Sequence, residues 1–77
     1  MRILVVEDEK KIASFIERGL IEQHYSVDVA YDGNEGLYLA EINPYDLVVL
    51  DIMLPDIEGT EVCRIIRNTS VIPILML

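Results

Sequence analysis

The sequence has a single cysteine, Cys63, among its 77 residues. One thiol cannot form an internal disulfide, and its isolation excludes the cysteine-rich zinc clusters and disulfide frameworks that stabilise many small domains. A chain of this length forms one domain at most, and a core of this size rarely supplies more than about 3–5 kcal/mol of net stability without a cross-link. We therefore expect a reducing, cytoplasmic setting and stabilisation from some further source.

Long apolar runs are absent as well. The N-terminal stretch MRILVVEDEKK has only four consecutive apolar residues, Ile3 to Val6, before acidic residues follow. A transmembrane helix needs about 20 apolar residues, and the apolar core of a signal peptide needs about 7–15. The sequence therefore predicts a soluble protein without a membrane partner.

Basic residues are scarce relative to acidic ones. Six lysines and arginines stand against 14 aspartates and glutamates, which gives a formal net charge of -8. Because this charge repels a phosphate backbone, it argues against direct binding of nucleic acid. It favours cations and basic partners instead.

Two hydrophobic periods alternate along the chain. Short apolar runs rich in β-branched residues predict strands, and longer segments with apolar residues at a spacing of 3.6 predict helices. The predicted strands are Arg2–Val6, Ser26–Tyr31, Asp46–Leu50 and Val71–Leu77. The predicted helices are roughly Glu9–Glu22, Asn34–Ile42 and Gly59–Arg67.

This alternation predicts an α/β fold with a parallel sheet and right-handed crossovers. The second strand alternates apolar and polar residues, as an edge strand does, whereas the other three are continuous apolar runs that need cover on both faces. We expect the first and third strands to be central. The apolar stripe of the first helix, which we expect in the core, contains Ile12, Phe15, Ile16 and Leu20.

Acidic residues follow both central strands at the point where each strand ends. Glu7 and Asp8 come after the first strand, and Asp51 comes after the third. Ligands of open parallel sheets bind at the carboxyl ends of the strands where the strand order reverses, so these carboxylates should converge there. Their mutual repulsion favours protonation unless a cation neutralises them, and a sparse set of oxygen ligands suits Mg²⁺. A purely capping role for Asp8, at the start of the first helix, is the alternative.

Three stretches, ILVVEDE, YDLVVLDIMLPDIEG and PILML, resemble the receiver domains of bacterial two-component response regulators, specifically those that precede a winged-helix DNA-binding domain. The resemblance covers the whole chain and implies a flavodoxin-like sheet with strand order 2-1-3-4. It implies that Asp51 is the phosphoacceptor and that Glu7, Asp8, Asp51 and the backbone carbonyl of Met53 bind Mg²⁺. The implied phosphoryl donor is a sensor histidine kinase, and the domain is not a multiple-turnover enzyme.

The resemblance also implies that residues 1–77 form a single truncated receiver domain. Receivers of this family continue past the fourth strand with a hydroxyl residue, a helix, a fifth strand ending in a lysine, and a final helix. We expect these parts, and the DNA-binding domain through which the protein would reach DNA, to be missing from this chain. The open edge of the fourth strand and the uncovered apolar face beside the first helix then predict a homodimer or higher oligomer.

Two other functions stay open on the sequence. One is a structural, self-associating fragment with a vestigial metal site. The other is a metal-dependent phosphotransferase or nuclease-like domain, but such domains carry a DxD pair where this chain has Asp51 and Met53. Neither a P-loop nor a GxGxxG motif is present to bind a nucleotide.

Overall fold

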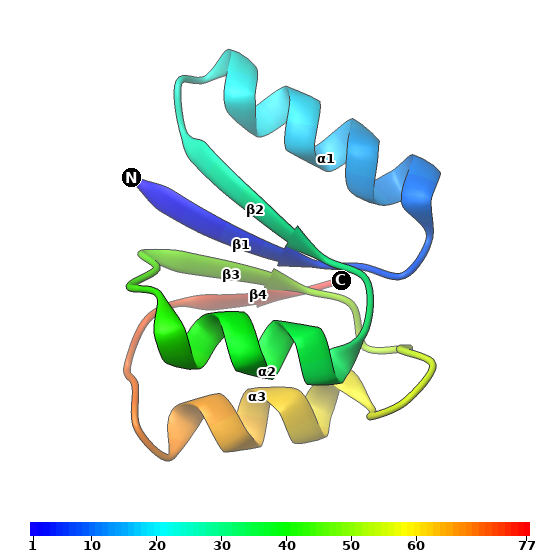
Figure 1. The fold of residues 1–77 in the computed structure, drawn as a ribbon, viewed down its shortest axis with the longest axis vertical. Coiled ribbons are helices and arrows are strands. Elements are labelled where there is room, and N and C mark those ends of the chain that lie inside the picture. The colour runs from blue at the N-terminus through cyan, green and yellow to red at the C-terminus, as the bar shows by residue number, and fades with distance from the viewer.

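The computed structural model describes residues 1–77 as one parallel sheet with helices on both faces (Figure 1). The sheet order β2-β1-β3-β4 confirms the predicted α/β fold and its 2-1-3-4 arrangement. The elements in chain order are β1 (Arg2–Val6), α1 (Lys10–Glu22), β2 (Ser26–Ala30), α2 (Gly33–Ile42), β3 (Leu47–Leu50), α3 (Gly59–Arg67) and β4 (Ile74–Met76). None of these helices combines the length and apolar character needed to cross a bilayer.

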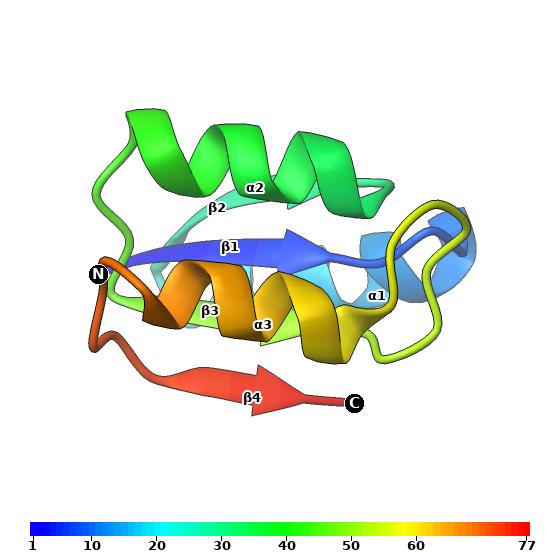
Figure 2. The same ribbon diagram turned by 90° about the horizontal axis from the view of Figure 1, so that it is seen from below.

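The core consists of two apolar clusters, one on each face of the sheet. Successive residues of a strand point to opposite faces, so β1 and β3 contribute side chains to both clusters. On the face covered by α2 and α3 (Figure 2), the fully buried members are Leu4, Val6, Ala30, Val48, Leu50 and Val62. On the face covered by α1, the buried members are Ile3, Val5 and Val49. This double burial explains why both central strands read as continuous apolar runs.

Helix α1 contributes less to the core than its apolar stripe predicted. Ile16 and Leu20 pack against the second cluster, whereas Ile12 is 48% exposed and Phe15 is 64% exposed. The prediction was therefore wrong for Ile12 and Phe15. The helix packs on β2 and β1. On β4, at the opposite edge of the sheet, Leu75 is 55% exposed.

Strand β4 is shorter than predicted, although its pairing with β3 reaches one residue beyond each end. The Pro73 carbonyl accepts a hydrogen bond from the Val48 N–H at 3.0 Å, and the Leu77 N–H donates to the Leu50 carbonyl at 2.9 Å. Proline has no N–H to contribute to a ladder, so the regular strand begins only after Pro73. The opposite edge of β4 has no neighbouring strand.

Candidate functional site

The ends of β1 and β3 bring three carboxylates together at one edge of the sheet. The two strands pair in parallel with Val6 opposite Leu50, so the residues that follow leave the sheet side by side. The Asp51 N–H donates to the Val6 carbonyl at 3.0 Å, which extends this pairing to the acid itself. One carboxylate oxygen from each of Glu7, Asp8 and Asp51 lies within 4.8 Å of the others. The structure thus gathers all three acids that the sequence analysis expected to converge.

Glu7 is the most buried member of this acidic group, with 4% of its surface exposed. The pKa of Glu7 is raised from its usual 4.5 to about 7, chiefly by burial and in part by the nearby Asp51 carboxylate. A hydrogen bond from the Glu9 N–H to Glu7 Oε2, 3.2 Å long, acts in the opposite direction. A bound cation would favour the ionised form of the Glu7 carboxyl group.

Asp8 is exposed and does not serve as the N-cap of α1. The N-cap is Glu9, whose side chain accepts a hydrogen bond from the Lys11 N–H at 3.5 Å. The alternative in which Asp8 has only a capping role is therefore wrong. The Asp8 carboxylate instead belongs to the acidic group at the end of β1.

The loop from Asp51 to Glu58 carries the other half of the site. Asp51 is partly exposed, and its Oδ1 accepts a hydrogen bond from the Met53 N–H at 3.2 Å. Met53 is 81% exposed, so its side chain contributes little to the packing of the loop. Met53 contacts the acidic group through its backbone N–H, which donates to Asp51.

Gly59 fixes the end of this loop at the start of α3. Its N–H donates to the Ile52 carbonyl at 2.7 Å. A Cβ atom at this position would lie 2.1 Å from the Asp51 carbonyl oxygen and 2.7 Å from Ile52 Cα. Because both contacts are with backbone, only glycine allows α3 to begin so close to the residues that follow β3.

Sequence reasoning assigned no role to Asp56, which connects the same loop to α2. Its Oδ1 accepts a hydrogen bond from the Gly33 N–H and its Oδ2 accepts one from the Asn34 N–H, each 2.8 Å long. These bonds, the one from Gly33 first, lower the pKa of Asp56. The free N–H groups at a helix N-terminus require acceptors. Nothing in the sequence indicates that two of them are satisfied from a loop more than 20 residues away.

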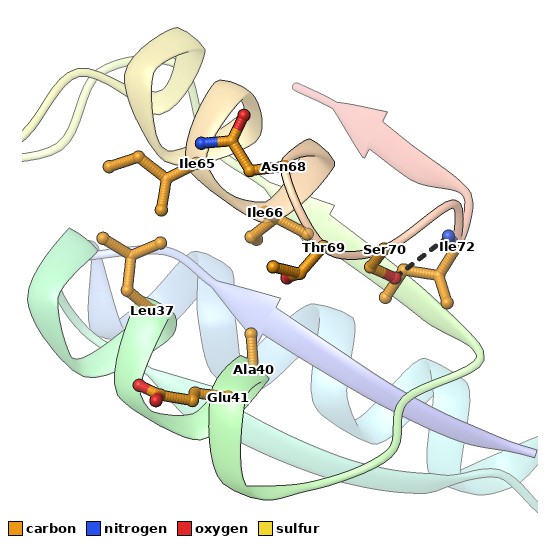
Figure 3. Close-up of a pocket in the computed structure, with 9 residues that line it drawn as sticks. All are labelled: Leu37, Ala40, Glu41, Ile65, Ile66, Asn68, Thr69, Ser70 and Ile72. Atoms are coloured by element: carbon orange, nitrogen blue, oxygen red, sulfur yellow. Dashed lines mark hydrogen bonds between the residues drawn. The ribbon is translucent and has the colours of Figure 1, made fainter.

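A cavity of about 600 Å³ lies between α2 and α3, away from the acidic group (Figure 3). Its lining comes from the second half of α2, the end of α3 and the segment leading to β4; the residues are Leu37, Ala40, Glu41, Ile65, Ile66, Asn68, Thr69, Ser70 and Ile72. None of the three converging acids lines it. The acidic group is therefore an open site at the sheet edge and not the base of a deep pocket.

Comparison with known sequences identifies a family that covers nearly the whole chain. The sequence profile described as "Response regulator receiver domain" matches residues 3–77. The response regulator ArlR of Staphylococcus saprophyticus is 50% identical over 76 residues, which is 99% of this chain and 34% of the relative. ArlR of Staphylococcus aureus strain Mu50 is 47% identical over 76 residues, or 99% of this chain and 35% of the relative. The chain thus spans about a third of the length of the curated relatives it matches.

Solved structures show the same fold. The receiver domain of the Francisella response regulator 1452 superposes with a TM-score of 0.92 at 37% identity, covering 97% of this chain and 63% of that one. The response regulator TrrA of Thermotoga maritima, solved in complex with Mg²⁺ and BeF, gives a TM-score of 0.87 at 43% identity, covering 90% of this chain and 60% of that one. Together with the family match, these likenesses show that the chain belongs to the response regulator receiver domain family.

Proposed function

We propose that this chain accepts a phosphoryl group on Asp51 from a sensor histidine kinase, in a reaction that uses Mg²⁺. The observation that carries the proposal is the convergence of the Glu7, Asp8 and Asp51 carboxylates within 4.8 Å at the carboxyl ends of β1 and β3. Membership of the receiver family supports it, as does a solved relative described as a complex with Mg²⁺ and BeF.

The donor set fits a hard divalent cation. All three side chains offer oxygen atoms, and we propose the Met53 carbonyl as the fourth protein ligand. Mg²⁺ typically takes only a few protein oxygens and keeps waters or phosphate oxygens in its remaining positions. The burial that raises the pKa of Glu7 also supports a cation at this site, because an ionised buried carboxylate needs a compensating charge.

Asp51 is the residue we propose to react. One of its carboxylate oxygens would attack the phosphorus of a phosphohistidine, forming the O–P bond of an acyl phosphate while the P–N bond to the imidazole breaks. The departing imidazole takes up a proton from solvent. Asp51 attacks as a carboxylate, which has no proton to be removed, so it requires no general base. Bound Mg²⁺ would supply charge neutralisation for the phosphoryl oxygens.

The side chains around Asp51 have separate roles in this proposal. Asp51 is partly exposed, so a donor can reach it from solvent. Glu7 is too buried to accept a phosphoryl group and would act only as a ligand. Asp8 is exposed and would bind the cation directly or through water. We propose a signalling role in the cytoplasm and no multiple-turnover catalysis.

The output of such a signal would require sequence outside these 77 residues. The curated relatives are about three times as long as this chain. We propose that phosphorylation of Asp51 controls transcription through a winged-helix DNA-binding domain beyond the residues described here. The net charge of -8 argues against direct contact between this segment and DNA.

The proposal is tested by incubating the chain with acetyl phosphate and Mg²⁺ and measuring its intact mass. We expect a mass increase of one phosphoryl group, located on Asp51 by peptide mapping. The increase should disappear when EDTA replaces Mg²⁺. Unchanged mass under saturating donor and Mg²⁺, in a sample shown to be folded by circular dichroism, would contradict the proposed function.

We also propose that the 77-residue chain, taken alone, associates with a second copy. The outer edge of β4 is unpaired (Figure 2), and Ile12, Phe15 and Leu75 expose 48%, 64% and 55% of their surfaces. An unpaired strand edge and exposed apolar side chains both favour association. Light scattering at micromolar concentration should report a dimer or larger species, and Leu75→Lys should shift it toward monomer. A folded wild-type monomer would refute this part of the proposal.

A further inference from the structure

The loop between β3 and α3 is attached to α2 through Asp56. Residues 51–58 contain no helix or strand, and their ends are fixed by β3 and by the close contact of Gly59 with Asp51. Between these ends, Asp56 uses both carboxylate oxygens to accept hydrogen bonds from Gly33 and Asn34, the first two residues of α2. The third N–H, that of Glu35, is satisfied by Asp32 at 2.7 Å. Asp56 is therefore the acceptor that completes the first turn of α2.

Helix α2 is in turn seated tightly on both the loop and β1. A Cβ atom on Gly36 would lie 2.9 Å from Val6 Cγ2, and Val6 is the residue immediately before Glu7. A Cβ atom on Gly33 would lie 3.1 Å from Ile57 Cβ in the loop. Two glycines thus let the first turns of α2 approach the end of β1, which Glu7 and Asp8 follow, and the loop that carries Met53. The helix connects the two halves of the acidic site.

We propose that Asp56 is a positioning residue for this site. By tying the loop to α2, it holds Asp51 and the Met53 backbone at a fixed separation from Glu7 without touching the cation or the phosphoryl group. This inference rests on the proposed function, since it concerns the same metal site. The inference is based on the two hydrogen bonds of Asp56 and on the close packing of α2 against β1 and the loop, not on the charge of Asp56.

The expected effect is on metal affinity. Mg²⁺ demands nearly ideal octahedral geometry, so ligands that must first be ordered bind it more weakly than ligands already in place. Residues that orient metal ligands without contacting the metal typically change affinity by about 10–100-fold when mutated. We expect Asp56→Ala to raise the Mg²⁺ concentration at half-saturation by about 10-fold, the lower end of this range. At saturating Mg²⁺, the chemical shifts of the Asp51 and Met53 amides should match those of the wild type.

The matched control is Glu58→Ala. Glu58 is an exposed acid in the same loop whose side chain makes no capping hydrogen bond to α3. Its removal changes the net charge as much as Asp56→Ala does, so any general electrostatic loss of Mg²⁺ affinity appears in both variants. Asp56→Asn keeps one acceptor oxygen, and we expect it to fall between the wild type and Asp56→Ala.

The experiment is an Mg²⁺ titration of the 77-residue chain, followed by NMR chemical shifts of the Asp51 and Met53 amides. Amide hydrogen exchange of Gly33 and Asn34, in EDTA, is measured in parallel and should accelerate in Asp56→Ala. If the Mg²⁺ concentration at half-saturation of Asp56→Ala is within twofold of that of Glu58→Ala, the positioning role is overturned. If Asp56→Ala does not fold, Asp56→Asn decides: a rise of about threefold supports the role, and wild-type affinity overturns it.

The two proposals fail in different ways. Absence of any saturable Mg²⁺ response in the wild type would contradict the proposed function itself, and the positioning role with it. A saturable wild-type response that Asp56→Ala leaves unchanged would contradict only the positioning role. Faster exchange at Gly33 and Asn34 with unchanged Mg²⁺ affinity would show that the contact supports α2 alone, and it too would overturn the inference.

Discussion

Asp51→Asn should abolish labelling by acetyl phosphate in the presence of Mg²⁺. The substitution replaces the carboxylate nucleophile by a neutral amide of almost the same size, and an amide oxygen does not form an acyl phosphate under these conditions. Asp51 is the partly exposed member of the three converging acids at the sheet edge, whereas Glu7 is buried. Asp8 is exposed, but in the proposed site it binds the cation, so we expect no other residue of the site to take over the reaction.

Loss of labelling in this variant is not explained by unfolding. The Asp51 backbone is anchored through its N–H, which donates to the Val6 carbonyl, and the substitution leaves this bond in place. Removal of its charge also relieves repulsion with Glu7. The variant should thus unfold at a denaturant concentration no lower than the wild type in EDTA. Glu58→Gln, which removes a charge from the same loop, should be labelled like the wild type. Labelling of Asp51→Asn at the wild-type rate would refute the assignment of the phosphoacceptor.

Glu7→Gln should make the metal-free protein more stable than the wild type at high pH. When Mg²⁺ is present, the variant should be the less stable of the two. Burial is the main reason that the pKa of Glu7 rises from 4.5 to about 7. A carboxyl group whose folded-state pKa is raised contributes stability that is fully present below 4.5 and is lost as the pH rises through about 7. Above that pH, an ionised Glu7 is buried beside Asp51 and destabilises the metal-free protein.

The size of this effect follows from the same two pKa values. A displacement from 4.5 to about 7 corresponds to roughly 3 kcal/mol between the two ends of the pH range. Glutamine does not ionise, so at pH 8.5 in EDTA we expect the free energy of unfolding of Glu7→Gln to exceed that of the wild type by about 1–3 kcal/mol. Saturating Mg²⁺ stabilises the folded form that binds it, and the wild type should then become the more stable protein.

Urea unfolding of both proteins at pH 5 and pH 8.5, with Mg²⁺ or with EDTA, measures this reversal. Glu58→Gln serves again as the control, because it removes a charge that is exposed and makes no capping bond. Its stability relative to the wild type should not change sign between the four conditions. A Glu7→Gln variant that is less stable than the wild type at pH 8.5 in EDTA would contradict the claim that burial of the ionised Glu7 carboxylate destabilises the metal-free protein.

The fold was predictable from the sequence because its strongest signals are local. Continuous apolar runs identified β1 and β3 as central strands, and the acids at their ends identified the edge where Glu7, Asp8 and Asp51 meet. Parallel strands necessarily place their carboxyl ends at the same edge, so the convergence followed from the topology.

The features that sequence reasoning missed depend on how elements meet in space. An apolar stripe on α1 looks the same whether it packs in the core or faces solvent, so the exposure of Ile12 and Phe15 could not be read from it. Three adjacent acids precede α1, and the path of the chain out of β1 decides that Glu9 rather than Asp8 is its N-cap. The hydrogen bonds of Asp56 join a loop to a helix that precedes it by more than 20 residues, which no local pattern encodes.

The central claim is that three acids from distant parts of the chain together bind one divalent cation. It is tested most directly by titrating Mg²⁺ into the wild-type chain at pH 7 and following the NMR signals of Glu7, Asp8 and Asp51. The account predicts that all three signals shift along a single saturable curve, and that Asp51→Asn lowers the affinity for Mg²⁺. Signals that do not move, or that drift in proportion to Mg²⁺ concentration without saturating, would contradict it.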